Sequence, residues 1–203
     1  MNAVHIARDF ELTGDLADAA WQKAKPARME YESRNYAARP AVATAVRVLW
    51  SEENLYLGYE SPFTELTLFE PPQFDKERLG LWDRDVVEAF IGSDPQNIKR
   101  YTEFEVAPTN EKLDLTLNLP DRDFDWSSGW KTAVKIDSTA NVWRCEMRIP
   151  LRALSETKPR AGTRWPINFY RMDKANKAAL AWSPALQGSF HTPEKFGVLE
   201  FGE

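Results

Sequence analysis

Most of the chain consists of short runs in which apolar and polar residues alternate, as they do in half-buried β-strands. The clearest run is 113–119, where leucines alternate with polar residues. The other strand-like runs are 43–50, 55–60, 101–106, 131–136, 142–149, 165–172, 180–182 and 197–201. Helical periodicity is confined to 16–21 and 150–154, while 61–80 shows weak periodicity and is predicted to be a long loop. The pattern therefore predicts an all-β protein with few helical turns.

Short strands separated by turns, without a βαβ rhythm, predict two antiparallel sheets packed as a β-sandwich of jelly-roll or immunoglobulin-like type. A length of 203 residues without internal repeats or low-complexity tracts favours a single domain that covers residues 1–203. The inward strand positions predict a core formed by Leu113, Leu115, Leu117, Trp143, Met147, Ile149 and Phe169. The polar residues of the same strands are then expected on an open face.

The run LWDRDVVEAFI at 81–91 combines an aromatic ring, several acidic residues and a buried-strand pattern. If it is one strand, Trp82 and Glu88 lie on the same face. A carboxylate in a two-sided strand needs a hydrogen-bond or charge partner. Two interpretations stay open. Either Glu88 pairs with Arg171 or Arg148 while Trp82 closes the edge of the sandwich, or Trp82 and Glu88 form a polar ligand site.

The charge balance argues against nucleic acid and membranes as partners. The formal net charge is −5 and no basic block is present, whereas phosphate and anionic lipid surfaces require clustered lysines and arginines. No run of about 18 apolar residues occurs, and the amino terminus lacks a basic and then apolar leader. The protein is therefore expected in the cytoplasm, or in the periplasm or outside the cell if a leader was removed.

Hydrolysis of a glycosidic bond is the strongest catalytic alternative. Glycosidases use a separated pair of carboxylates, which Glu88 with Glu103 or Glu105 would supply. The chain has no GxSxG motif and no phosphate-binding glycine loop. Its one cysteine, Cys145, lies at an inward strand position and has no partner for an internal disulfide. No catalytic residue is predicted, and the glycosidase stays an alternative.

Metal binding receives little support from the sequence. His5 and His191 lack the spacing of zinc ligands. No EF-hand pattern is present, but oxygen-rich calcium sites stay open because several aspartates lie in or beside turns. These are Asp15, Asp18, Asp83, Asp85 and Asp173. No cofactor is required, and calcium is not assigned to a site.

Aromatic residues and carboxylates together favour the recognition of a sugar. The chain contains eight Trp, eleven Phe and six Tyr. A pyranose presents apolar C–H faces that stack on rings, and hydroxyls that need hydrogen-bond partners. Trp82 and Glu88 supply one group of each kind within a short stretch.

Eight pieces of the chain match one known family in order. They are the turn and helix at 14–21, VRVLWSEENLYL at 46–57, WDRDVVEAFI at 82–91, FEV at 104–106, EMRIP at 146–150, INFYRMD at 167–173, AWSP at 181–184 and PEKFGVLEF at 193–201. On these pieces the chain resembles the family-nine carbohydrate-binding modules over nearly its whole length. The resemblance implies an antiparallel β-sandwich that binds a sugar or the end of a polysaccharide without catalysis.

The resemblance also implies where the sugar binds. In the sugar-binding members two tryptophans sandwich a terminal sugar. Trp82 matches the first of them, and Glu88 matches its partner carboxylate. Phe190 stands at the place of the second tryptophan, with Trp182 as an alternative wall. Gln187 falls near an amide in the loop before that wall.

Two matched positions differ in chemical character from those modules. Glu105 stands where they have an arginine, and Tyr170 stands where they have a glutamine. Both differences change the hydrogen bonds that a ligand would meet. Together with Arg171, these residues are predicted to be polar contacts of the ligand.

The resemblance has two wider implications. Modules of this kind are expected to guide a partner glycoside hydrolase or a transporter to a glycan. The broader sandwich superfamily also includes haem-binding domains of redox proteins. A haem would need axial ligands such as His191 with Met172 or Met147.

Overall fold

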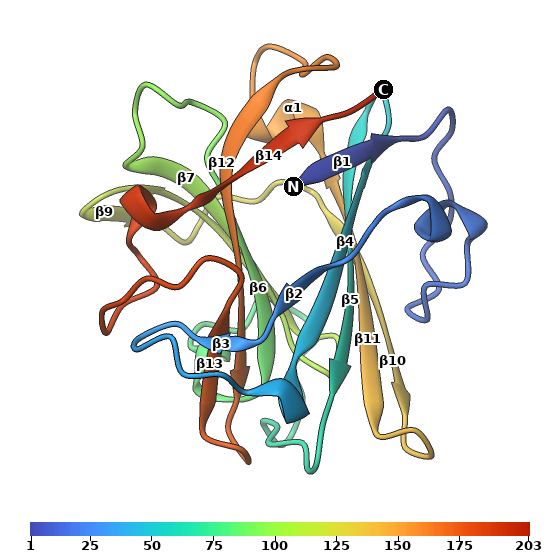
Figure 1. Ribbon diagram of the computed structural model, residues 1–203, viewed down its shortest axis with the longest axis vertical. Coiled ribbons are helices and arrows are strands. Elements are labelled where there is room, and N and C mark those ends of the chain that lie inside the picture. Colours follow the sequence, from blue (N-terminus) through green and yellow to red (C-terminus); the bar gives the residue numbers. More distant parts are fainter.

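The computed structural model describes all 203 residues, and strands dominate it (Figure 1). The strands are β1 (Asn2–His5), β2 (Ala27–Met29), β3 (Tyr31–Glu32), β4 (Thr44–Trp50), β5 (Asn54–Pro62), β6 (Val86–Ile91), β7 (Arg100–Val106), β8 (Lys112–Asn118), β9 (Asp121–Asp123), β10 (Lys131–Asp137), β11 (Val142–Pro150), β12 (Arg164–Asp173), β13 (Ala178–Ala181) and β14 (Gly197–Phe201). The helices are the 3₁₀ helices η1 (Ala19–Lys23), η2 (Pro40–Val42), η3 (Leu81–Asp83) and η4 (Pro193–Lys195), and the α-helical turn α1 (Leu151–Leu154). No helix exceeds 5 residues, and none of them could span a membrane. The prediction of an all-β protein with few helical turns is confirmed.

One hydrogen-bonded path connects most strands, in the order β10-β11-β5-β4-β1-β14-β12-β6-β7-β8-β9. Neighbours are antiparallel except at β1, which runs parallel to both β14 and β4 and joins the two halves of the path (Figure 1). Off this path, β13 pairs with β12 and β3, and β2 pairs with β4. The sheet is therefore mixed and not purely antiparallel as expected. The run at β1 is too short for its alternation to reveal a strand, and alternation carries no information on strand direction.

The two halves of the path pack against each other across the main hydrophobic core. From one half, β4, β5 and β11 contribute side chains such as Val48, Leu57 and Met147. From the other half, β6 and β12 contribute Ala89 and Phe169. Four predicted core residues lie in this cluster, namely Trp143, Met147, Ile149 and Phe169. Their prediction is confirmed.

The three leucines of β8 are buried on the other face of their strand. These are Leu113, Leu115 and Leu117. They belong to a second apolar cluster with Phe90 and Tyr170, and this cluster is separate from the main core. Asp114 lies across from Phe104 on the core side, fully buried, and its carboxylate accepts a hydrogen bond of 2.7 Å from the backbone N–H of Ser128. The predicted burial of the three leucines is confirmed, although they belong to a separate cluster. The expectation of an open polar face is wrong at Asp114, because residues of the main core side cover it.

The run 81–91 is not one strand. Gly80 adopts a left-handed conformation with φ 82°, and Leu81–Asp83 then forms η3. The strand β6 begins only at Val86, after the Asp85 carboxylate accepts hydrogen bonds from two backbone N–H groups, at Thr67 and Lys174. Trp82 therefore stands on a helical turn and does not share a strand face with Glu88. The preceding stretch contains no helix or strand between Pro62 and Leu81, as predicted.

A buried carboxylate fastens the amino-terminal segment to β11. Glu146 is fully buried and accepts hydrogen bonds from the backbone N–H of Thr13 and from that of Gly14, at 2.7 Å for the latter. Its second oxygen accepts a bond of 2.8 Å from Nε1 of Trp21, which is itself fully buried. Gly14 has φ 81°, and a Cβ there would lie 2.6 Å from the backbone carbon of Val134. The segment thus depends on this one carboxylate and on a glycine at its turn.

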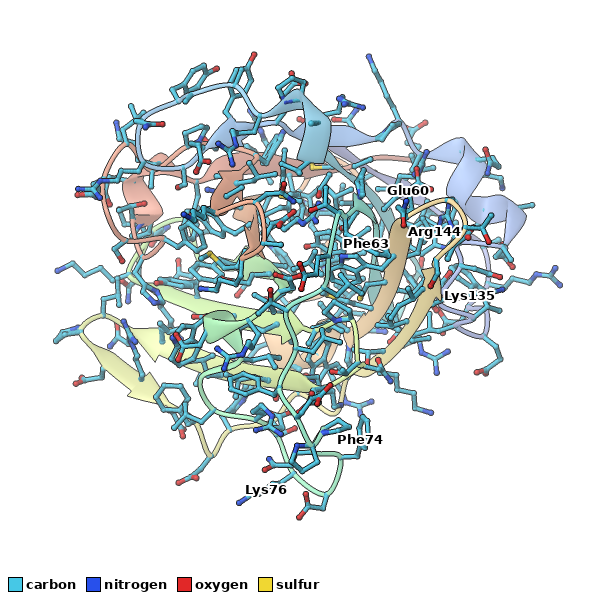
Figure 2. All side chains as sticks on the ribbon, turned by 90° about the horizontal axis from the view of Figure 1, so that it is seen from below. Glu60, Phe63, Phe74, Lys76, Lys135 and Arg144 are labelled. Carbon is cyan, nitrogen blue, oxygen red and sulfur yellow. The ribbon has the colours of Figure 1, made fainter.

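Replacing Glu146 with glutamine should lower the free energy of unfolding by about 1.5–3 kcal/mol, because charge-assisted hydrogen bonds are lost and the new NH₂ group meets donors only. The matched control is Glu60→Gln on β5, which removes a partly exposed ion pair of 2.7 Å with Arg144 (Figure 2). That change should be worth about 1 kcal/mol or less. Urea unfolding followed by tryptophan fluorescence measures both variants. Equal effects would contradict the anchoring role of Glu146.

Candidate functional site

One face of β12, β6, β7 and β8, turned away from the main core, carries the candidate site. β6 buries its odd-numbered side chains in the main core, so Glu88 and Phe90 point to the other face. Pairing with β7 sets Glu105 directly across from Glu88, and Glu103 across from Phe90. Pairing with β12 sets Tyr170 across from Glu88 on its other side. Strand register alone therefore brings acidic and aromatic side chains together here.

A cavity of about 380 Å³ opens on this face. Small-molecule sites typically measure about 300–1,000 Å³. The lining residues come from η3, from the strands of this face, from the turn after β12 and from β13. Others come from β9, from the residue after it and from the loop that precedes η4. The full lining consists of Trp82, Glu88, Phe90, Glu103, Leu115, Arg122, Phe124, Met172, Lys174, Ala179, Gly188, Ser189, Phe190 and His191. The cavity thus combines aromatic walls with charged groups of both signs.

The ring of Phe190 is held in place from behind. It stacks on Tyr170, with ring centroids 4.1 Å apart and 11° between the planes. The Tyr170 hydroxyl donates a hydrogen bond of 2.9 Å to the Phe190 carbonyl and accepts one of 2.7 Å from Nδ2 of Asn168. Trp82 is half-buried on η3 and packs against the same second apolar cluster. The cavity therefore has two aromatic walls that come from distant parts of the chain.

His191 forms an uncharged part of the lining. Its ring stacks on Phe90 at 5.3 Å and 24°, and a hydrogen bond of 2.7 Å joins its Nδ1 to the Tyr101 hydroxyl. Burial, with a contribution from Arg122, lowers the pKa of His191 to about 4. The imidazole is therefore neutral near pH 7, and it cannot balance the negative charge nearby.

Three glutamates lie together at the floor of the cavity, and we call Glu88, Glu103 and Glu105 the glutamate cluster. One carboxylate oxygen from each lies within 4.8 Å of the other two. The side chains are buried, with residue exposures of 2%, 4% and 0%. Four of their oxygens have no hydrogen-bond partner: Oε1 of Glu88, Oε2 of Glu103 and both oxygens of Glu105. Buried carboxylates without partners are rare in proteins, so this cluster is the most unusual feature of the site.

Burial raises the pKa of Glu88 and of Glu105 well above the usual range, and the charge of neighbouring glutamates raises it further. Burial also raises the pKa of Glu103, to about 7. Lys174 and Arg122 line the cavity and oppose these shifts, but neither forms an ion pair with the cluster. Three adjacent buried charges are unstable together, so near neutral pH the cluster must hold protons or bind a cation.

Five of the predicted site residues gather at the cavity. Trp82, Glu88 and Phe190 line it directly. Glu105 and Tyr170 are fully buried and stand immediately behind the lining, the first beside Glu88 and the second beneath Phe190. These residues come from η3, β6, β7, β12 and the loop before η4, so only the fold could bring them together.

Glu88 has no arginine partner. Arg171 pairs with Asp173 at 2.8 Å, and both side chains are fully buried. Arg148 donates a hydrogen bond of 3.1 Å to the carbonyl of Phe10. The interpretation in which Glu88 pairs with Arg171 or Arg148 is therefore wrong.

Three other predicted site residues lie outside the cavity. Arg171 follows Tyr170 on β12 and so points to the core side, where it donates hydrogen bonds to the Val42 carbonyl and to Oγ1 of Thr44. Trp182 follows Ala181, which pairs across from Tyr170, so its ring also lies on the core side, 5.8 Å from that of Phe169. Gln187 is exposed, and its nearest polar partner is Glu194 at 3.5 Å. Strand alternation explains the first two positions.

The aspartates considered for calcium do not converge. Asp15 pairs with Lys135, Asp18 caps η1, and Asp85 binds backbone N–H groups. Asp173 pairs with Arg171, and Asp83 is exposed. Among all residues, the glutamate cluster is the one group of three or more metal-ligating side chains whose ligand atoms converge.

Comparison with known proteins supplies the family. The family model described as "Carbohydrate family 9 binding domain-like" matches residues 12–203 of the chain. The chain belongs to this carbohydrate family 9 binding domain-like family. An extracellular protein of Arthroderma benhamiae is 25% identical over 181 residues, which cover 80% of this chain and 80% of that protein. Endo-1,4-beta-xylanase A of Thermotoga neapolitana is 30% identical over 166 residues, which cover 77% of this chain but only 14% of the xylanase.

Solved structures of the family share the fold. A candidate carbohydrate-binding protein from Bacteroides uniformis superposes with a TM-score of 0.78 at 17% identity, covering 99% of this chain and 98% of that one. A family 9 module from Caldicellulosiruptor kristjanssonii, solved in complex with cellotriose, superposes with a TM-score of 0.71 at 16% identity. That match covers 100% of this chain and 94% of the module. At these identities the likeness establishes the fold.

Several residues of the family 9 cavity were missed by sequence reasoning. Phe90 lies two residues after Glu88 on β6 and therefore on the same face, so strand alternation is enough to predict that it lines the cavity. Arg122, Lys174 and Ser189 lie on a short exposed strand, in a turn and in a loop, where no periodicity marks a direction. Only the three-dimensional arrangement reveals that they face the same space.

The Tyr170 hydroxyl should position Phe190. In Tyr170→Phe the Phe190 carbonyl loses a hydrogen bond, and we expect the free energy of unfolding to fall by about 0.5–1.5 kcal/mol. Hydrogen exchange of the backbone amides at 187–192 should become faster, because this loop loses its anchor to β12. The control is Tyr36→Phe, since Tyr36 is 55% exposed and does not line the cavity. Unchanged exchange in Tyr170→Phe would show that stacking alone holds the loop.

Proposed function

We propose that residues 1–203 act as one non-catalytic carbohydrate-binding module that receives the end of a saccharide in the cavity between Trp82 and Phe190. The observation that carries this proposal is the arrangement of two aromatic walls, one from η3 and one from the loop before η4, around a floor of carboxylates. Rings contact the apolar faces of a pyranose, and carboxylates accept hydrogen bonds from its hydroxyls. The complex of a family 9 module with cellotriose supports a β-linked glucan as the first ligand to test.

The charged residues at the cavity add polar contacts for the sugar. Lys174, Arg122 and Ser189 supply donors at its lining, whereas Glu88 and Glu103 supply acceptors. A pyranose hydroxyl can both donate and accept, so it suits a site in which donors and acceptors are mixed. This balance supports a sugar more than a purely apolar ligand.

The placement of the carboxylates argues against glycosidase activity. Glycosidases hold two carboxyl groups on either side of the scissile bond, so that the sugar lies between them. Glu105 does not reach the cavity lining, whereas Glu88 and Glu103 lie side by side on one sheet face at the floor. This arrangement favours contact with one side of a bound sugar over cleavage of a bond between two carboxylates.

The haem alternative receives less support. Met147 is fully buried in the main core and cannot reach the cavity. His191 and Met172 do line the cavity. A porphyrin carries two carboxylates of its own, which the unpaired glutamates would repel.

A catalytic partner is supported by one relative. The region of Thermotoga neapolitana xylanase A that matches this chain is a small part of a longer enzyme. We propose that this module likewise acts beside a glycoside hydrolase or transporter and holds it near its glycan. The fold provides the surface for such a role without contributing to bond cleavage.

Loss of the Trp82 ring should weaken saccharide binding while the protein stays folded. Stacking and apolar burial of one ring contribute about 1–2 kcal/mol, so Trp82→Ala should weaken cellotriose binding about tenfold. The matched control is Phe74→Ala, since Phe74 is 69% exposed in the loop before η3 and does not line the cavity (Figure 2). Isothermal titration with a panel of oligosaccharides, together with thermal unfolding, measures both properties. A large loss of stability with unchanged affinity would mean that Trp82 is a structural residue.

Incubation with the same panel should yield no hydrolysis products. The expected result is intact oligosaccharide after prolonged incubation of the wild-type chain, as read by mass spectrometry. Turnover that disappears in Glu88→Gln would contradict the non-catalytic proposal. Turnover that persists in that variant would indicate a contaminating hydrolase, because a carboxamide cannot replace the acid or nucleophile.

A further inference from the structure

The glutamate cluster is not explained by saccharide binding alone. A neutral sugar needs one or two acceptors, which Glu88 and Glu103 already offer at the cavity lining. Glu105 is different, since it is fully buried and does not reach the lining. Neither of its oxygens accepts a hydrogen bond from a donor group of the protein. Its polar side-chain neighbour is the Glu103 carboxyl group, which can share a hydrogen bond with it only when one of the two carries a proton. Such a side chain indicates that something absent from the protein itself satisfies it.

We propose that Glu88, Glu103 and Glu105 bind a calcium ion at the floor of the cavity, where the ion can also coordinate hydroxyl groups of a saccharide. The metal site goes beyond the proposed function and does not depend on it. The contact between ion and sugar does rest on that function.

The geometry suits calcium among the oxygen-binding cations. Ca²⁺ lies about 2.3–2.6 Å from its ligands, so two oxygens on opposite sides of it are about 4.6–5.2 Å apart. The three carboxylate oxygens lie within 4.8 Å of one another and therefore fit around one such ion. Mg²⁺ demands near-ideal octahedral geometry at about 2.0–2.1 Å and is usually held by one or two carboxylates, whereas three converge here. Zinc prefers nitrogen and sulfur ligands.

The access route and the remaining ligands are also present. Glu88 and Glu103 line the cavity, so an ion can reach the cluster from that side. Three carboxylates supply up to six of the six to eight oxygens that Ca²⁺ takes, and water or saccharide hydroxyls in the cavity can supply the others. The ion would thus connect the protein floor to the ligand.

Other charged groups near the cluster change its attraction for a cation. Lys174 acts on Glu88 and Arg122 acts on Glu103 from the cavity lining, while Asp83 adds negative charge near Glu105. His191 lies 3.9 Å from Oε2 of Glu103. The two cations weaken the attraction for calcium, but neither forms an ion pair with the cluster, and the three carboxylates together outweigh them.

Calcium binding to the full chain, stripped of metal with EDTA, tests the site. We expect calcium chloride to raise the melting temperature and to titrate as one ion per chain by calorimetry. In Glu105→Gln the affinity should fall about tenfold or more, since calcium affinity follows the number of charged ligands. Without metal this variant should be at least as stable as the wild type, because a buried charge is removed. If it does not fold, Glu103→Gln decides the same point.

The control Asp15→Asn changes a half-buried turn aspartate that pairs with Lys135 and is not part of the glutamate cluster, so it should leave the calcium effect intact. The inference is overturned if calcium has no effect on the wild type. It is also overturned if calcium stabilises Glu105→Gln and Glu103→Gln as much as it stabilises the wild type. It is also overturned if metal has no effect while glucosamine binds in a manner that Glu105→Gln abolishes. In that case the cluster would serve an ammonium group of the ligand.

Cellotriose titrations in calcium and in EDTA separate this inference from the proposed function. We expect calcium to strengthen binding to the wild type, and to have no effect on binding to Glu105→Gln. Calcium binding without any saccharide binding would overturn the proposed function and the contact between ion and sugar. The inference of a calcium site would still stand. Saccharide binding that is equal in calcium and in EDTA, with no calcium bound, would overturn the metal site alone.

Discussion

Burial of the odd-numbered residues of β6 between the two halves of the sheet is the constraint on which the site depends. Val87, Ala89 and Ile91 are fully or almost fully buried in the main core, and burying each of the two larger side chains contributes about 1.5–3 kcal/mol. Because side chains alternate, this burial fixes Glu88 on the cavity side. The register with β7 then sets Glu105 across from it. The energy of the core therefore holds like charges together that would separate if they were free to move.

The aromatic layer on the cavity side strengthens that effect. Phe90 contacts Tyr101, Tyr170 and His191 with ring centroids between 4.9 and 5.6 Å. These rings exclude water from the floor around the carboxylates, and a lower local dielectric makes every charge interaction stronger. Repulsion within the cluster and attraction for a cation both grow for this reason. The same rings also give the cavity its fixed walls, so packing and recognition depend on the same residues.

Period-two alternation was sufficient to predict most strands and the direction of Glu88, because both follow from local sequence. It could not assign the leucines of β8, since alternation separates two faces without indicating which of them meets the other half of the sheet. η3 escaped prediction because one left-handed glycine, Gly80, turns a run that otherwise reads as a strand. Trp182 is expected at the site because it is near Phe190 in sequence, and Arg171 is expected there as a polar contact. Each of them directly follows a residue of the cavity face, so each points to the core side instead. For both residues, the alternation of side chains along the strand predicts the correct face.

The identity of residue 105 bears most directly on what the cavity recognises. The resemblance to the sugar-binding modules implies an arginine at this place. An arginine across the strand from Glu88 would neutralise it and leave a floor suited to neutral sugars. Glu105 puts an acidic group there instead, and burial beside Glu88 and Glu103 raises its pKa, so the floor carries either a bound proton or an unbalanced negative charge. Two like charges directly across a strand pair destabilise the sheet unless a proton or a cation lies between them. A bound cation between Glu88 and Glu105 would balance the negative charge that the missing arginine no longer balances. Such a cation can enter from solvent through the cavity.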